Sequence, residues 1–149
     1  MTIATNILPT VDFCGTELTR LMIGGNQFRG YSHFSEELNV KMREYYSVEN
    51  AASTACSRAA TELSFQWSMP IAQPGGNMHW IVQTAKPCIA YKILAASRKC
   101  GSEEEIRASF QYAFDHIKPG DIVNVGMFQK HLDQVAMNAK MVREVLGAA

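Results

Sequence analysis

The last third of the chain alternates between short apolar runs and amphipathic helical patterns. Cys88–Leu94 is almost entirely apolar and precedes a helical pattern over Glu103–Ile117, and the apolar run Ile122–Val125 precedes a second helical pattern over His131–Leu146. Apolar runs of this length are typical of strands that are covered on both faces, and strand–helix alternation favours a parallel sheet. The sequence therefore predicts an α/β fold.

The first two thirds of the chain predict further elements of the same kind, although one connection breaks the pattern. Only four residues, Thr84–Pro87, separate the expected strand Met78–Gln83 from the expected strand Cys88–Leu94. A parallel crossover connection between two strands needs about a dozen residues. Three explanations stay open: an antiparallel pair, a run that is not a strand, or a chain that lacks the middle section of a larger ancestor. The expected elements are the strands Thr19–Ile23, Leu63–Trp67 and Met78–Gln83 and the helices Glu36–Tyr46 and Val48–Glu62.

The composition argues against several classes of function. The 149 residues suffice for one domain, and 14 basic residues balance 14 acidic ones, so a surface for nucleic acid is not expected. No apolar run approaches the roughly 20 residues that span a bilayer, and the start of the chain lacks the basic segment of a secretory signal. Neither a membrane partner nor secretion is therefore expected. Widely spaced cysteines favour reduced thiols in a cytoplasmic protein, and this chain has Cys14, Cys56, Cys88 and Cys100.

Small and basic residues follow both predicted strands of the last third, at Ala95–Lys99 and Gly126–Lys130. These turns lie at the carboxyl ends of the strands, directly before helices. Helix starts offer unpaired N–H groups and the positive end of the helix dipole, so parallel α/β proteins bind phosphate groups there. The sequence therefore predicts a site for a phosphate-bearing ligand.

Three segments carry the pattern of a known family. TELTRLMIGGNQFRG at Thr16–Gly30, PCIAYKILAASR at Pro87–Arg98 and the segment Asp121–Leu146 resemble the first, seventh and eighth strands of the aldo-keto reductase-like (β/α)8-barrel superfamily of NADP-dependent oxidoreductases. The resemblance implies one domain, residues 1–149, in which residues 16–83 correspond to the first barrel units and residues 87–149 to the last two βα units. It also implies a partial TIM-barrel-like fold of about five mostly parallel strands with three or four helices, shortened by the middle strands.

The resemblance implies a cofactor site at the segment that corresponds to the seventh barrel strand. Tyr91 would stack on the nicotinamide ring, and Lys92 and Leu94 would lie near the pyrophosphate. Arg98 follows in the turn, where a basic side chain would favour the 2′-phosphate and hence NADP over NAD. From the residues alone, a regular strand turns Tyr91 and Lys92 to opposite faces, so core packing of Tyr91 and a solvated Lys92 stay open as alternatives.

The segment that corresponds to the eighth strand carries the rest of the implied site. Gly126 would let the backbone approach a phosphate, and Gln129 and Lys130 would flank the adenosine end of the cofactor. Lys130 is a second side chain that would favour the 2′-phosphate. Gln134 and Asn138 match the helix positions that reach the adenine in this family.

The family's catalytic set is an Asp and a Tyr after strand two, a Lys after strand three and a His after strand four. In this chain Ser68–Pro70 follows Leu63–Trp67, without an Asp–Tyr pair. Two catalytic candidates stay open: His33 in the loop after the first strand, and Lys92, which would form a Schiff base if it were desolvated. The histidines show no metal-ligand spacing, so no metal site is expected.

These patterns lead to three expectations of function. The first is a nicotinamide-nucleotide-binding, oxidoreductase-like protein of the aldo-keto reductase type, with or without catalytic activity on a small-molecule substrate. The second is a non-catalytic, barrel-derived protein that self-assembles, and the third is an aldolase- or lyase-like barrel that uses Lys92. A partial barrel leaves sheet edges and an apolar surface uncovered, so a homo-oligomer is expected.

Overall fold

The computed structural model describes residues 8–51, 64–65 and 84–148. The expected strand Met78–Gln83 and most of the expected helix Val48–Glu62 lie outside the described residues. Leu63–Trp67 is described only at Ser64–Phe65, which form a short strand. At the start of Val48–Glu62, the Ser47 hydroxyl accepts a hydrogen bond from the Asn50 N–H (3.2 Å), as expected for a helix cap.

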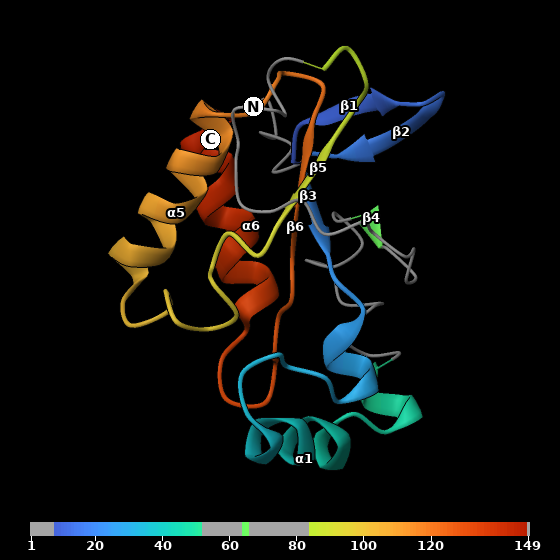
Figure 1. The fold of residues 1–149 in the computed structure, drawn as a ribbon, viewed down its shortest axis with the longest axis vertical. Helices are drawn as coiled ribbons and strands as arrows, with labels where there is room; N and C mark the ends of the chain where they lie inside the picture. The colour runs from blue at the N-terminus through green and yellow to red at the C-terminus, as the bar shows by residue number, and fades with distance from the viewer. Residues whose placement is uncertain (1–7, 52–63, 66–83, 149) are drawn as a thin grey trace, which may run out of the picture.

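The centre of the fold is a parallel sheet with the strand order β4-β3-β6-β5 (Figure 1). β3 (Leu21–Ile23) lies between β4 (Ser64–Phe65) and β6 (Ile122–Val125), and β5 (Ile89–Tyr91) pairs with the other edge of β6. All three pairings are parallel. The predicted α/β fold with a parallel sheet is therefore confirmed, whereas the described strands form a small open sheet and not a closed barrel.

Two helices cover one side of this sheet. α5 (Glu103–Asp115) and α6 (Gln134–Val145) lie next to each other in Figure 1 and share one apolar core with the strands. Ser102 and Glu105, three residues apart, are the Ser–Glu pair that predicts a capped helix start, and the Ser102 hydroxyl accepts a hydrogen bond from the Glu105 N–H (3.2 Å). Fully buried side chains from both layers form the core: Leu21, Phe110, Ile122, Val123, Val135 and Val142.

A third helix, α1 (Glu36–Tyr45), lies at the end of the sheet where the parallel strands finish (Figure 1). It agrees with the expected helix Glu36–Tyr46 to within one residue. The Tyr46 hydroxyl donates to the Met127 carbonyl (3.3 Å) and the Tyr45 hydroxyl to the Gln129 carbonyl (3.3 Å). These bonds fix the end of α1 against the loop that follows β6.

The expected strand Cys88–Leu94 is wrong at its carboxyl end. β5 stops at Tyr91, and Lys92 adopts a left-handed backbone conformation with φ 59°. The Ala95 N–H then donates to the Lys92 carbonyl (2.9 Å), which closes a turn. Ile93 and Leu94 pack against the core from this turn, so their apolar character reflects burial and not strand structure.

The expected strand Thr19–Ile23 is also corrected. Only Leu21–Ile23 belongs to the parallel sheet, because Thr19 ends β2 (Thr16–Thr19), which pairs antiparallel with β1 (Thr10–Phe13). The hairpin turn is Cys14–Gly15, in which both residues have positive φ. Such a two-residue turn matches the twist of a hairpin.

The last helix starts later than His131. Asp133 is its cap, because its carboxylate accepts a hydrogen bond from the Ala136 N–H (3.0 Å). Leu132, the first apolar residue of the expected helical pattern His131–Leu146, precedes the helix and is exposed. The buried stripe of α6 therefore begins at Val135.

At the end of the sheet opposite to α1, a buried carboxylate ties the start of β5 to the loop that precedes β6. Asp121 is fully buried and accepts hydrogen bonds from the Cys88 N–H (2.8 Å), the Lys118 N–H (2.9 Å) and the Lys118 ammonium (2.9 Å). These donors come from the start of β5 and from the loop between α5 and β6. The ammonium compensates the buried charge, and the backbone bonds fix where both strands begin.

We expect Asp121→Ala to lower the free energy of unfolding by about 3 kcal/mol, because it leaves a partly buried ammonium and two N–H groups without their acceptor. The matched control is Asp115→Ala, which removes an exposed carboxylate on α5. Urea denaturation of both variants measures the effect. Equal, small losses in the two variants would contradict the structural role of Asp121.

Candidate functional site

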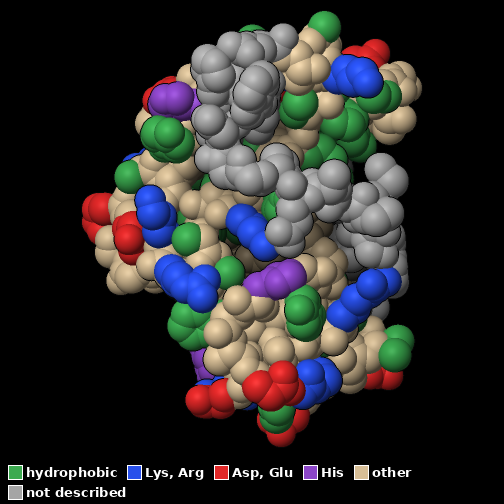
Figure 2. All heavy atoms as spheres, in the orientation of Figure 1, with side chains coloured by type: hydrophobic (Ala, Val, Ile, Leu, Met, Phe, Trp, Pro, Cys, Tyr) green, Lys and Arg blue, Asp and Glu red, His purple; other side chains and the backbone are tan. Residues whose placement is uncertain are grey.

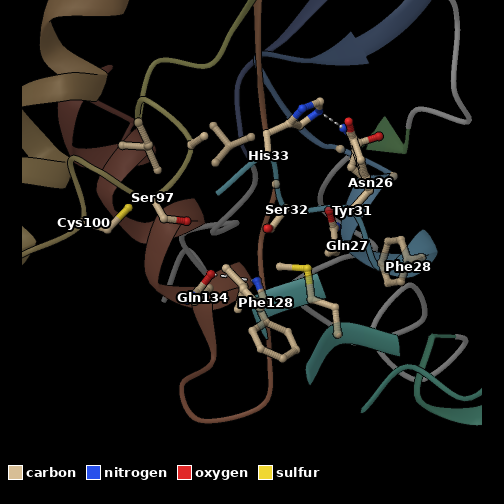
Figure 3. A pocket seen from close by; sticks show the side chains of 18 of the residues that line it. Asn26, Gln27, Phe28, Tyr31, Ser32, His33, Ser97, Cys100, Phe128 and Gln134 are labelled. Carbon is tan, nitrogen blue, oxygen red and sulfur yellow. Dashed lines mark hydrogen bonds between the residues drawn. The ribbon is translucent and has the colours of Figure 1, made fainter. Parts of the chain in front are cut away.

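A large hollow lies where the parallel strands end. It is a cavity of about 1200 Å³, bounded by the loops that follow β3, β5 and β6, by α1 and by the start of α6. Figure 3 shows side chains from these loops facing one another across the cavity. Carboxyl ends of parallel strands are the usual place of a binding site in open α/β sheets.

The cavity gathers most of the residues that the sequence pointed to. The predicted residues among its lining are His33, Tyr91, Lys92, Leu94, Gly126, Gln134 and Asn138. They come from loops and from a helix start that are far apart in the sequence. The structure thus brings residues from both ends of the chain around one space.

Three predicted residues do not line this cavity. The guanidinium of Arg98 lies 5.6 Å from the centre of the Phe34 ring and donates to the Ala95 carbonyl (3.0 Å). The side chain of Gln129 accepts from the Val135 N–H (3.1 Å), so it supports the start of α6. Lys130 is exposed. Arg98, Gly126 and Lys130 therefore do not form one cradle.

The turns after β3 and β6 place glycines beside each other. The Gly24 N–H donates to the Val125 carbonyl (2.9 Å), which extends the β3–β6 pairing by one step. A methyl group at Gly24 would lie 3.1 Å from the Asn124 side-chain oxygen, and one at Gly126 would lie 3.5 Å from the side-chain oxygen of Gln27. The absence of side chains at these two positions keeps the strand ends open to the cavity.

The first N–H groups of α6, which the sequence predicted to be free, are already hydrogen-bonded, and at α5 the Glu105 N–H is also bonded. At α5 the Glu105 N–H already donates to Ser102, and the Glu105 carboxylate accepts from the Gly101 N–H (2.9 Å). At α6 the first N–H groups donate to Asp133 and Gln129. Positive charge at the cavity therefore comes from side chains, and its basic lining residues are Arg29 and Lys92.

Strained backbone gathers at the same place. Positive φ angles occur at four non-glycine residues of the lining: His33 (59°), Lys92 (59°), Ala96 (52°) and Ser97 (71°). Each such residue costs about 1–2 kcal/mol, and such conformations cluster at functional sites. The bend at Lys92 also ends the strand alternation, so both Tyr91 and Lys92 reach the cavity.

His33 lies at the mouth of the cavity. Its Nε2 lies 3.0 Å from the Asn26 amide nitrogen, a donor, so the ring accepts through Nε2 and is neutral. Desolvation and the nearby positive charge of Lys92 lower the pKa of His33 below its ordinary value of 6.5. Figure 2 shows Lys or Arg and His side chains next to each other at a hollow in the middle of one face.

Two buried side-chain amides in the lining have polar atoms that are not hydrogen-bonded among the described residues. Gln27 is 2% exposed, and neither its side-chain nitrogen nor its side-chain oxygen is hydrogen-bonded. Asn138 is 3% exposed, and its side-chain oxygen is likewise unbonded. The sequence alone does not single out Gln27, because one glutamine in the loop after Gly24–Gly25 forms no recognisable pattern.

We expect the His33 ring to titrate below pH 6.5, and Lys92→Met to raise its pKa towards 6.5 because a nearby positive charge is removed. The neutral ring therefore stabilises the fold above about pH 6.5, and this contribution is lost as the pH falls through the lowered pKa. NMR titration of the ring protons measures both. Lys99→Met, at an exposed lysine outside the cavity, is the control. An unchanged His33 pKa in Lys92→Met would contradict their proximity.

No family model, curated protein or solved structure matches this chain. In the part of the chain that the structure describes, no helix is long and apolar enough to cross a membrane. Within the same ranges, no cluster of three or more His, Cys, Asp or Glu side chains is arranged to hold a metal ion. The cavity and its lining are therefore the basis for a functional proposal.

Proposed function

We propose that this chain binds a nicotinamide dinucleotide, NADP or NAD, in the cavity at the carboxyl ends of its strands, as an oxidoreductase-like protein of the aldo-keto reductase type. One observation carries the proposal. The cavity is lined by six of the nine residues to which the family resemblance assigns the cofactor, and these six come from two separate segments: Tyr91, Lys92, Leu94, Gly126, Gln134 and Asn138.

The order of the strands supports the finer fold proposal, a partial (β/α) barrel. In a closed eight-stranded barrel the first strand lies between the second and the last, and the seventh lies beside the last. The order β4-β3-β6-β5 has the same neighbours if β3 corresponds to the first barrel strand, β4 to the second, β5 to the seventh and β6 to the last. The parallel direction of every pairing agrees with this proposal.

The chemistry of the lining suits the parts of a dinucleotide. Tyr91 offers a ring for stacking, and the Lys92 ammonium has no carboxylate partner among the described residues, so it is available for a pyrophosphate. The unbonded oxygen of Asn138 is a buried acceptor, which an adenine amino group would satisfy. Gly24 and Gly126 allow backbone to lie close to the ligand.

Turnover by this chain is expected to be slow. Carbonyl reduction needs a proton donor next to the carbonyl oxygen, and His33 is the titratable imidazole of the described lining. Its lowered pKa keeps it neutral at pH 7, so it is a poor general acid. The proposal is therefore nucleotide binding with weak or no reductase activity.

The geometry gives little support to a lysine-dependent aldolase. Lys92 lies at the cavity, but its side chain is exposed. An amine nucleophile is activated by desolvation or by a second cation. Lys92 is accordingly assigned to anion binding.

We expect NADPH and NADH to bind with similar affinity, because Arg98 and Lys130 lie outside the cavity lining. At about 100 times its dissociation constant, either nucleotide should stabilise the fold by about 2.7 kcal/mol in thermal unfolding. Lys92→Met should weaken binding about tenfold through the loss of a charge-assisted contact. Lys99→Met is the matched control and should bind like the wild type. Failure of both nucleotides to shift the unfolding transition would refute the proposed function.

A further inference from the structure

The turn that carries Gln27 is held in place, but the side-chain nitrogen and oxygen of Gln27 make no hydrogen bond within the described residues. It lies in the 3-10 helix η1 (Asn26–Arg29), the turn that follows β3. Backbone hydrogen bonds hold this turn: the Phe28 N–H donates to the Gly25 carbonyl (3.2 Å) and the Gly30 N–H to the Gln27 carbonyl (3.1 Å). The amide of Gln27 is labelled in Figure 3 among the cavity residues.

Three other glutamines of the described residues use their amides for structure. Gln134 accepts from the Phe128 N–H (2.8 Å), Gln129 accepts from the Val135 N–H, and Gln111 donates to Asp115 (2.8 Å) on the surface of α5. Gln27 makes no such bond within the described residues. A buried, unpaired polar group costs about 1–3 kcal/mol, and Gln27 carries two of them. Folding alone would favour an apolar side chain at this position.

The location of the amide tells which part of a ligand it would meet. Its oxygen lies 3.5 Å from the position of a methyl group at Gly126, so the amide lies over the end of β6. This is the deep side of the cavity, since Gln27 is buried while His33 and Lys92 at the mouth are exposed. A group bound there would meet both a donor and an acceptor.

We propose that Gln27 recognises a planar amide edge on the ligand, in which an N–H group and a carbonyl lie side by side. Resting on the proposed function, this edge is the carboxamide of the nicotinamide ring. The Gln27 oxygen would accept from the carboxamide NH₂, and the Gln27 nitrogen would donate to its carbonyl. A carboxylate in place of the carboxamide has no donor, and it would face the Gln27 oxygen with a negative charge.

The test compares Gln27→Met, which keeps the volume and removes both polar atoms, with Gln111→Met at the exposed glutamine of α5. Without ligand, Gln27→Met should unfold at the same or a higher temperature than the wild type, because an unpaired buried amide is removed. Its affinity for NADP should fall about tenfold or more. Gln111→Met should change neither the affinity nor the selectivity of binding.

Two further probes distinguish the sources of the amide edge. Nicotinic acid adenine dinucleotide phosphate, which has the carboxylate, should bind the wild type at least about tenfold more weakly than NADP, and Gln27→Met should bind the two alike. Flavin mononucleotide offers a ring amide edge instead. If it binds through Gln27 and NADP does not bind, the nicotinamide assignment fails while amide recognition by Gln27 stands.

Other outcomes overturn the inference. Equal NADP affinity of the wild type and Gln27→Met would leave nucleotide binding intact and exclude Gln27 from recognition. A clear loss of stability in ligand-free Gln27→Met would show that the amide serves the fold. Binding of none of the three probes to the wild type would remove both this inference and the proposed function.

Discussion

The pairing of β3 with β6 is the contact on which the rest of the structure depends. Leu21 pairs with Val123 and Ile23 with Val125, which joins segments about a hundred residues apart in the chain. The entropy lost in closing so long a loop grows only slowly with its length, and burial of these apolar side chains opposes it. Because the strands are parallel and in register, Gly24 and Gly126 end side by side, and the loops that leave them surround the cavity.

The cavity contrasts with the opposite end of the sheet in how its buried polar groups are satisfied. At that opposite end the buried Asp121 carboxylate has backbone and ammonium donors. At the carboxyl ends of the strands, Gln27 and Asn138 keep unbonded amide atoms, and Lys92 has strained backbone. Features that cost stability and gather in one place are typical of a site selected for binding.

Local signals predicted part of this structure, and tertiary contacts decided the rest. The strand Ile122–Val125 and the capped start of α5 were predicted because short apolar runs and a Ser–Glu pair act locally. The end of β5 was not, since Ile93 and Leu94 are apolar for packing in a turn. Gln27 was not predicted as a site residue, because a single glutamine forms no pattern in the sequence. Its burial and its lack of hydrogen-bond partners among the described residues are properties of the folded chain. The predicted contact of Arg98 with the cofactor depended on the path of the turn after β5, and the spacing of residues in the sequence does not determine that path.

The central claim is that a nicotinamide dinucleotide occupies the space between the ends of β3 and β6. Titration of the ¹⁵N-labelled chain with NADPH, followed by amide NMR, tests it most directly. The account predicts saturable shifts of the backbone amide signals of Gly24, Gln27 and Gly126, while Gly120, at the opposite end of β6, stays unchanged. Saturable shifts confined to Gly120 and its neighbours, or no saturable shift at all, would contradict it.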